Sequence, residues 1–301
     1  MKALVKERGI KKTKGDIVFG ILNYAVFGLF TLICFYPFYY LIINSVSAND
    51  LSSNGSINFL PSQLHLENYK QVLQLKGLGL AALVSVGRTI IGTICTVLAS
   101  AFLGFMFTQE RMWRRKLWYR LMVVTMYFNA GLIPMFLTMQ NLHLTNSFWV
   151  YVIPVIVQPF NIILVKTYME SIPRSLQEAA EIDGCSIFQY FIKIVLPLSK
   201  SIIAIMVLYY AVGHWNSFFN GLIYVSDAKL YPLQLILRDI LISGQSVDPS
   251  VSDPEAIELM KQIARTIKYG VIIVSSLPVL ILYPFVQKHF VKGVLTGSVK
   301  G

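Results

Sequence analysis

The sequence predicts an all-α integral membrane protein with six transmembrane helices. Composition is the first indication: 55% of the 301 residues are hydrophobic and 14% are charged, whereas roughly 25% are charged in a typical soluble domain. Long runs without charged residues are the second indication, and an uneven distribution of Lys and Arg between the loops is the third. A chain this apolar could not cover a water-facing surface, whereas lipid accepts an apolar outer face.

Four runs of the chain carry no charged residue, and a fifth carries one. They are residues 17–49, 121–165, 201–226 and 269–287, and 77–109 with Arg88. A helix needs about 20 apolar residues to cross a bilayer, and barrel strands would instead alternate over about 10 residues. Helices are therefore expected near 17–44, 81–109, 118–139, 147–166, 200–225 and 268–287.

The Lys and Arg residues predict the orientation of this bundle. An even number of crossings places both termini on one side of the membrane. That side collects 18 of the 26 basic residues, in the two tails and the 110–120 and 166–200 loops, and the other side holds 7. The positive-inside rule makes both termini cytoplasmic. The net charge of +11 is then largely a topology signal. Without a basic soluble domain, no nucleic-acid partner is expected.

The expected topology divides the chain into three parts. Residues 1–80 form a cytoplasmic tail, the first span and an outside segment; residues 81–290 form a core of five spans with a cytoplasmic loop at 170–199; residues 291–301 form a cytoplasmic tail. The outside segments, about 45–80 and 226–267, are long enough for short surface helices. The second is acidic, and either a solvated rim or a docking surface for an external protein fits it.

The most specific pattern lies in the cytoplasmic loop between the fourth and fifth spans. Pro173 suits the first turn of a helix. Gly184 stands where a helix would end in a left-handed residue. Ser186 can cap a second, amphipathic helix that stops near Pro197. The pattern predicts a short helix, a sharp glycine turn and an amphipathic helix at the cytoplasmic face.

One face of the first loop helix suits a partner protein. Small alanine side chains allow another protein to approach closely, and Glu178 and Glu181 offer it carboxylates. Residues at i, i+3, i+4 and i+7 share a helix face. At that spacing the helix carries Leu176, Ala179, Ala180 and Asp183.

This loop resembles the EAA loop of ABC importer permeases. The matching positions are Glu178, Ala179, Ala180, Asp183, Gly184, Ile194, Leu196 and Pro197. The resemblance extends over nearly the whole chain through segments 67–70, 131–134, 210–217 and 230–234. The chain is similar to the MalG-like inner-membrane permeases of carbohydrate importers, in the branch for oligosaccharides, aldouronate or polysaccharide fragments.

The resemblance implies a fold, partners and a mechanism. It implies a type I ABC importer permease fold in a multi-pass protein of the bacterial cytoplasmic membrane. The chain would form the path with a second, homologous permease as a heterodimer, and its 173–197 loop would couple to two cytoplasmic ABC ATPase subunits. An extracellular lipoprotein would deliver the oligosaccharide. The sequence has no Gly-rich phosphate loop, so the chain is expected to be no enzyme and to bind no cofactor, with ATP and Mg held by the ATPases.

Polar side chains within the spans are the candidates for the sugar path. Such groups are costly in lipid unless they are buried in protein or face water. Bonds between helices without any ligand explain them as well. The candidates are Asn129, Gln158, Asn161, His214, Trp215, Asn216 and Asn220, with Tyr127, Phe128 and Tyr210 as aromatic faces. Arg88, the lone charge in a span, is expected to have a structural role.

Two other functions stay open beside the oligosaccharide importer. One is a permease of an ABC importer for a different solute. The other is a secondary carrier working alone, which should have acidic ion-coupling residues in its spans; here all acidic residues lie outside the expected spans. A membrane-embedded enzyme is disfavoured because no metal-ligand or catalytic-triad spacing appears. The three cysteines form neither a disulfide framework nor a metal pattern.

Overall fold

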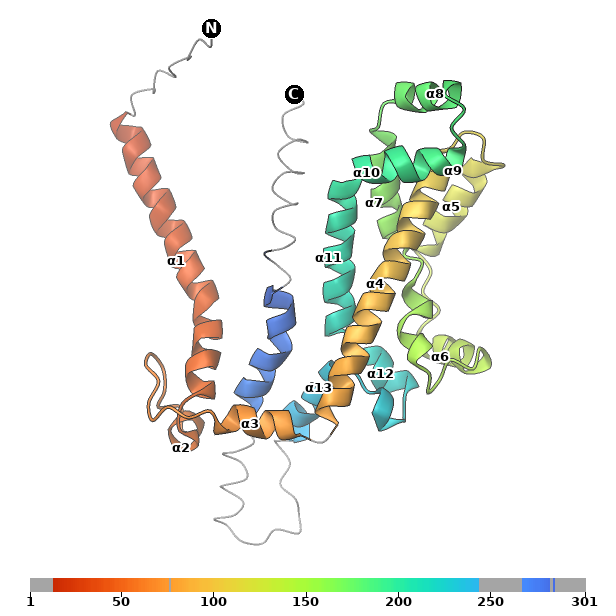
Figure 1. The fold of residues 1–301 in the computed structure, drawn as a ribbon. Helices are drawn as coiled ribbons and strands as arrows, with labels where there is room; N and C mark the ends of the chain where they lie inside the picture. The colour runs from red at the N-terminus through yellow and green to blue at the C-terminus, as the bar shows by residue number, and fades with distance from the viewer. Residues whose placement is uncertain (1–12, 76, 244–266, 282–283, 285–301) are drawn as a thin grey trace.

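The computed structural model describes residues 13–75, 77–243, 267–281 and 284, and the regular secondary structure of these residues is entirely helical (Figure 1). Along the chain the helices are α1 (Lys14–Ser45), α2 (Asn49–Ser53), α3 (Glu67–Gln74), α4 (Leu78–Thr108), α5 (Arg115–Thr125), α6 (Leu132–Asn141), η1 (Phe148–Tyr151), η2 (Ile153–Val155), α7 (Pro159–Glu170), α8 (Arg174–Ile182), α9 (Ile187–Tyr190), η3 (Phe191–Val195), α10 (Leu196–Leu198), α11 (Lys200–Asn216), α12 (Phe219–Tyr224), η4 (Ala228–Leu230), α13 (Leu233–Ser243) and Ile267–Ile281.

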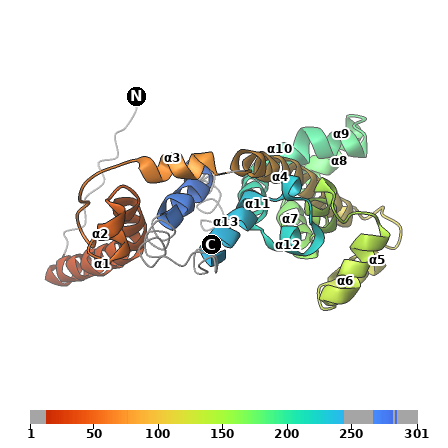
Figure 2. The ribbon, with the colours of Figure 1, turned by 90° about the horizontal axis from the view of Figure 1, so that it is seen from below.

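Helix α1 stands apart from the bundle (Figures 1 and 2). Its start is fixed by a capping box, in which the Thr13 hydroxyl accepts from the Asp16 amide at 3.2 Å and the Asp16 carboxylate accepts from the Thr13 amide at 2.8 Å. Apolar side chains lie exposed on all sides of this 32-residue helix. A helix that is apolar all round must be covered by lipid or by another chain.

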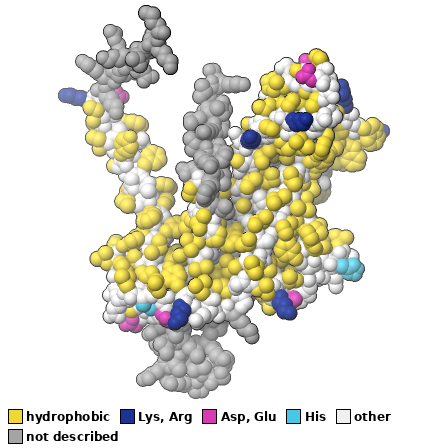
Figure 3. Space-filling view, viewed as in Figure 1, with side chains coloured by type: hydrophobic (Ala, Val, Ile, Leu, Met, Phe, Trp, Pro, Cys, Tyr) yellow, Lys and Arg dark blue, Asp and Glu magenta, His cyan; other side chains and the backbone are white. Residues whose placement is uncertain are grey.

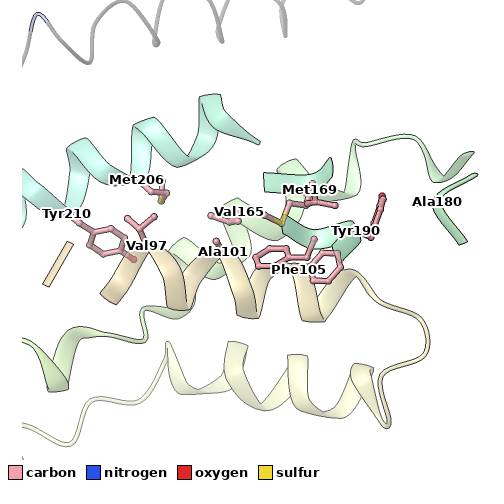
Figure 4. Packing of buried hydrophobic residues seen from close by; sticks show 11 residues of the cluster. Val97, Ala101, Phe105, Val165, Met169, Ala180, Tyr190, Met206 and Tyr210 are labelled. Atoms are coloured by element: carbon pink, nitrogen blue, oxygen red, sulfur yellow. The ribbon is translucent and has the colours of Figure 1, made fainter. Parts of the chain in front are cut away.

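Helix α4 is the centre of the bundle and packs against α7 and α11. Small residues make the approach close: Gly104 lies against Val165 of α7, and Gly92 lies against the ring of His214 on α11. Figure 4 shows Val97, Ala101 and Phe105 of α4 directed toward these helices. Small residues at helix crossings let backbones approach and gain dispersion contacts.

A second core lies at the end of the bundle opposite α8 (Figure 1). Helix α3 runs between α1 and the bundle (Figure 2), and its Val72 is fully buried against neighbours from four other helices. These neighbours are Leu78, Trp215, Leu233, Leu237 and Val271. The short helices α2 and α3 confirm the surface helices expected in the 45–80 segment. The acidic residues of the second outside segment after Ser243 lie outside the described residues.

Three of the expected spans, near 118–139, 147–166 and 200–225, are broken. This corrects the continuous helices expected for the first and the third, whereas Pro154 and Pro159 already indicate a kink in the second. The first is divided into α5 and α6 by residues 126–131, which end at Gly131 with φ of 84°. The second bends by 50° before α7, because the residue preceding Pro159 disfavours helical backbone. The third stops at Asn216 and resumes in α12. Hydropathy averages over such breaks and therefore misses them.

Helices α1 and α4 are each long and apolar enough to cross a membrane. Two bent pairs also pass this test together: Phe148–Val155 with Pro159–Glu170, and Ile187–Leu198 with Lys200–Asn216. Charged side chains gather at the two ends of an apolar belt (Figure 3). The first residues of α1 and helix α8 lie at the same end (Figure 1), as expected if the N-terminal tail and the 166–200 loop share one side of the membrane.

Candidate functional site

The coupling segment, defined here as residues 171–199, forms two helical pieces at one end of the bundle. Helix α8 is followed by Gly184 with φ of 74°, which confirms the predicted left-handed turn. Ser186 then begins a capping box with Gln189, at 3.3 Å and 3.0 Å. The following helix has a π turn over Phe191–Val195, a feature that often occurs at functional sites.

The inner face of α8 is anchored by apolar packing. Ala180 is buried in the same cluster as Met169, Tyr190 and Phe191 (Figure 4). The rings of Phe191 and Phe105 stack with 4.7 Å between their centroids. This packing joins the coupling segment to α4.

Polar contacts join α8 to the loop after α4. Arg111 pairs with Glu181 at 2.8 Å, and Arg174 pairs with Glu110 at 2.7 Å. Between α8 and this loop lies a polar cavity of about 410 Å³. Glu181, expected to offer its carboxylate to a partner protein, therefore pairs with an arginine of its own chain.

The exposed face of α8 differs from the predicted one. Ala179 is exposed and Ala180 is buried, so the two do not share a face. Ile182 is 87% exposed, on the same side as Ala179. Sequence reasoning missed Ile182, although its i+3 spacing from Ala179 was a usable signal. Glu178, Asp183, Gly184 and Pro197 are also exposed, and Leu196 packs partly buried against the core.

A second cavity, of about 740 Å³, lies between α4, α7, α11 and α12. It is hereafter called the bundle cavity. Its volume falls in the range of roughly 300–1,000 Å³ typical of small-molecule sites. Of the seven candidate path residues, five line it: Gln158, Asn161, His214, Asn216 and Asn220. The aromatic side chains of Tyr151, Phe160, Tyr209 and Tyr210 line it as well.

Hydrogen bonds and close packing hold part of this lining in place. The Asn161 amide donates to the Tyr210 hydroxyl at 2.6 Å, and that hydroxyl lies 3.3 Å from the Ser100 hydroxyl. His214 is buried against Gly92. Asn161 and His214 thus join helices and line the cavity at once, so the two interpretations of these residues do not exclude each other.

Arg88 also lines the bundle cavity, with 1% of its surface exposed. Its Nη2 donates to the backbone carbonyls of Trp215, at 3.2 Å, and of Ser217. Its guanidinium carbon lies 5.3 Å from the centroid of the Tyr151 ring. The bonds to the end of α11 agree with the structural role expected for this residue, and the cavity position was not foreseen.

Comparisons with known proteins identify the molecule. The family described as "Binding-protein-dependent transport system inner membrane component" matches residues 96–296. The chain belongs to this family. It is 36% identical to the polygalacturonan/rhamnogalacturonan transport system permease protein YtcP of Bacillus subtilis, over 94% of this chain and 99% of the relative. It is 35% identical to protein LplC of the same species, over 96% and 97%.

A solved structure agrees with these relatives. One chain of a bacterial ABC transporter involved in the import of the acidic polysaccharide alginate superposes with a TM-score of 0.82. The two chains are 30% identical, and the match covers 93% of this permease and 99% of that chain. The protein is thus an all-α inner-membrane permease of an ABC transporter with the fold of that importer, and it is a transport component, not an enzyme.

Two candidate path residues lie away from the bundle cavity of the permease. The Trp215 indole donates to the Ser275 carbonyl at 2.8 Å and belongs to the core beside α3. Asn129 lies in the break between α5 and α6, where its side-chain oxygen accepts from the Gly131 amide at 2.9 Å. The neighbouring Tyr127 and Phe128 are strongly exposed. Hydropathy could not distinguish Asn129 and Trp215 from the residues that line the cavity, because all of these positions fall within apolar runs.

Proposed function

We propose that this permease is one subunit of a heterodimeric, ATP-driven importer for oligosaccharides or polysaccharide fragments. The observation that carries the substrate class is the likeness over nearly the whole chain to a permease named for polygalacturonan and rhamnogalacturonan. The bundle cavity supports it, since its amide side chains suit sugar hydroxyls and its aromatic faces suit sugar rings. An extracellular lipoprotein delivers the oligosaccharide, and a second permease completes the path.

In the proposed topology the permease crosses the membrane six times with both termini in the cytoplasm. The six crossings are α1, α4, the α5–α6 unit, the η1–α7 unit, α11 with α12, and the helix at 267–281. The position of α8 at the same end of the molecule as the start of α1 supports a cytoplasmic coupling segment (Figure 1). The broken units line the interior of the assembly, where backbone that leaves the helix is tolerated.

Coupling to the ATPases is assigned to the exposed face of α8. Ala179 and Ile182 enter a groove on one ATPase, with Glu178 and Asp183 beside them. The turn at Gly184 directs α8 toward that groove, and Ala180, Leu196 and Pro197 support it from behind. ATP and Mg are bound by the ATPases, and closure of these subunits moves α8. The stack of Phe105 on Phe191 passes the movement to α4.

The sugar path is assigned to the bundle cavity, with Gln158, Asn161, His214, Asn216 and Asn220 as its polar lining. Asn129, in the exposed break before α6, is assigned to the surface that faces the second permease. Trp215 is not assigned to the path, because its indole N–H and its backbone carbonyl both already have partners in the protein. Alternating access then means that the same lining faces first the lipoprotein and later the cytoplasm.

The assembled importer in proteoliposomes tests this function. The two permeases, the ATPases and the lipoprotein are expected to take up labelled oligosaccharides only when ATP is present on the ATPase side. Uptake driven by an ion gradient without ATP would instead support a secondary carrier. Uptake of a solute other than a sugar, with no oligosaccharide uptake, would support an importer for a different solute.

The variant Gly184→Asp tests the coupling segment separately. Asp tolerates the left-handed conformation better than most residues, and open space surrounds this position, so the two permeases should still assemble. The added charge lies in the proposed ATPase groove, so co-purification of the ATPases should be lost. Normal co-purification would contradict the assignment of α8.

A further inference from the structure

Arg88 has an unbalanced charge beside the bundle cavity. It is almost completely buried and lies about one third of the way along the 31-residue helix α4. The ion pairs among the described residues do not include it, and its Nε has no hydrogen-bond partner there. A buried charge within a membrane domain is costly unless another group compensates it.

The protein supplies only part of that compensation. The carbonyls of Trp215 and Ser217, which accept from Arg88, lie at the end of α11. The C-terminal end of a helix is equivalent to about half a negative elementary charge. The Tyr151 ring adds an attraction to its face, at 5.3 Å. About half a positive charge therefore remains at the wall of the cavity, and the lining residues that the structure describes include no Asp or Glu.

The rest of the lining suits the other parts of a sugar acid. Asn216 and Asn220 carry amides that can donate to and accept from hydroxyl groups. The aromatic faces of Phe160 and Tyr209 give flat apolar contact area. The guanidinium is the side chain best suited to a carboxylate, because its planar N–H groups match the two oxygens.

We propose, on the basis of the function proposed above, that the importer carries oligosaccharides with uronate units and that Arg88 binds a uronate carboxylate in the bundle cavity. The guanidinium keeps its bonds to the end of α11 and offers its remaining N–H groups to the substrate. The names of two similar proteins are consistent with an acidic substrate. One is named for polygalacturonan and rhamnogalacturonan, and the other belongs to a transporter involved in the import of the acidic polysaccharide alginate.

The test compares acidic and neutral forms of the same sugar. The reconstituted importer is given trigalacturonate and trimannuronate, each as the free acid and as the methyl ester, together with neutral oligosaccharides. The measured quantity is the ratio of acid uptake to ester uptake. Arg88→Gln should lower this ratio at least tenfold, whereas Arg88→Lys, which keeps the charge but loses the planar N–H groups, should lower it less. Arg238→Gln is the matched control, since Arg238 is a half-exposed arginine paired with Asp239 outside the cavity.

A second variant keeps Arg88 and its bonds. Asn216→Asp has nearly the same shape and places a carboxylate in the cavity next to the carbonyls that hold Arg88. It should compete with the substrate carboxylate and lower the acid-to-ester ratio as well. This variant decides the question if Arg88→Gln does not assemble.

The outcomes separate this inference from the proposed function. An unchanged ratio in Asn216→Asp and in Arg88→Gln would show that Arg88 only holds the end of α11, and would overturn the inference. Uptake of neutral oligosaccharides but of neither uronate would overturn it while the importer function stands. Uptake of no oligosaccharide at all would overturn the proposed function itself.

Discussion

The coupling segment and the bundle cavity are built in opposite ways. Residues 171–199 form α8, its glycine turn and the following helix from one continuous stretch of chain. The bundle cavity collects side chains from α4, η1, α7, α11 and α12, and Arg88 bonds to a carbonyl 129 residues further along the chain. The first region is exposed and carries ion pairs at its surface, whereas the second is a largely apolar, open cavity between helices.

The difference shows which contacts each function depends on. A lever that docks on another protein needs a defined local shape, which a cap and a glycine turn provide. A substrate site between helices needs the helices at fixed distances, which small residues such as Gly92 and Gly104 provide. Changes in the two regions should therefore separate assembly with the ATPases from integrity of the membrane bundle.

The largest expected effect is in the bundle. A Cβ on Gly92 would lie 2.5 Å from Cε1 of the buried His214 ring, so Gly92→Val should force α4 and α11 apart and destabilise the permease by about 3 kcal/mol. Gly87→Ala is the control, because its Cβ would meet Phe148 at an ordinary 3.7 Å. Thermal unfolding of the purified importer measures both. Equal unfolding temperatures for the two variants would contradict the close α4–α11 contact.

The next effect concerns the turn of the coupling segment. Gly184→Val should cost about 1–2 kcal/mol, because a residue with a Cβ is strained in the left-handed conformation. Gly184→Asn, at the same position, should cost less since Asn enters that region more readily. ATPase co-purification should follow the same order. Equal ATPase co-purification with the two variants would mean that the backbone conformation at this position does not limit docking.

A third prediction concerns the docking face alone. Ile182 is 87% exposed, so Ile182→Glu should leave the unfolding temperature of the permease unchanged. Its affinity for the ATPases should fall at least tenfold, about 1.4 kcal/mol. Ile182→Leu is the conservative control. Titration of detergent-purified ATPase against the two variants gives the comparison, and retained affinity in the Glu variant would move the docking face elsewhere on α8.

The smallest effect is expected for the surface ion pairs. The side chains of Arg111 and Glu181 are 69% and 37% exposed, and such pairs contribute roughly 0.2–1 kcal/mol. Arg111→Glu should therefore weaken the attachment of α8 to the loop after α4 only slightly, and the effect should diminish in high salt. Adding Glu181→Arg should restore the ion pair with reversed charges. A double-mutant cycle on ATPase stimulation measures the coupling, and a loss above tenfold would indicate that the pair acts as more than a surface contact.

Local signals predicted the coupling segment well. The short helix, the left-handed Gly184 and the capping Ser186 all follow from residue types at fixed offsets, and each is present. The face of α8 was predicted incorrectly, because α8 turns Ala180 toward Tyr190 and Phe191. Which side of a helix is buried depends on the element that packs on it, and this information is absent from the helix itself.

The membrane spans also show that local sequence patterns do not contain information on tertiary contacts. The long helices α1 and α4 were predicted within a few residues, since apolar length alone determines them. The breaks at 126–131 and after Asn216 were missed. Backbone groups without helical hydrogen bonds are tolerated in a membrane only where other parts of the protein or water bind them. A hydropathy average does not include those partners.

The sequence by itself determined that this chain enters a membrane, that its 171–199 loop forms a short helix with a glycine turn, and which polar side chains its apolar runs contain, because these properties depend on composition and short-range spacing. Tertiary structure alone decided that Gln158, Asn161 and Asn220 share a cavity with Arg88 while Trp215 and Asn129 do not. Side chains far apart in the sequence come together only through helix packing, and that packing is fixed by contacts such as Gly92 with His214.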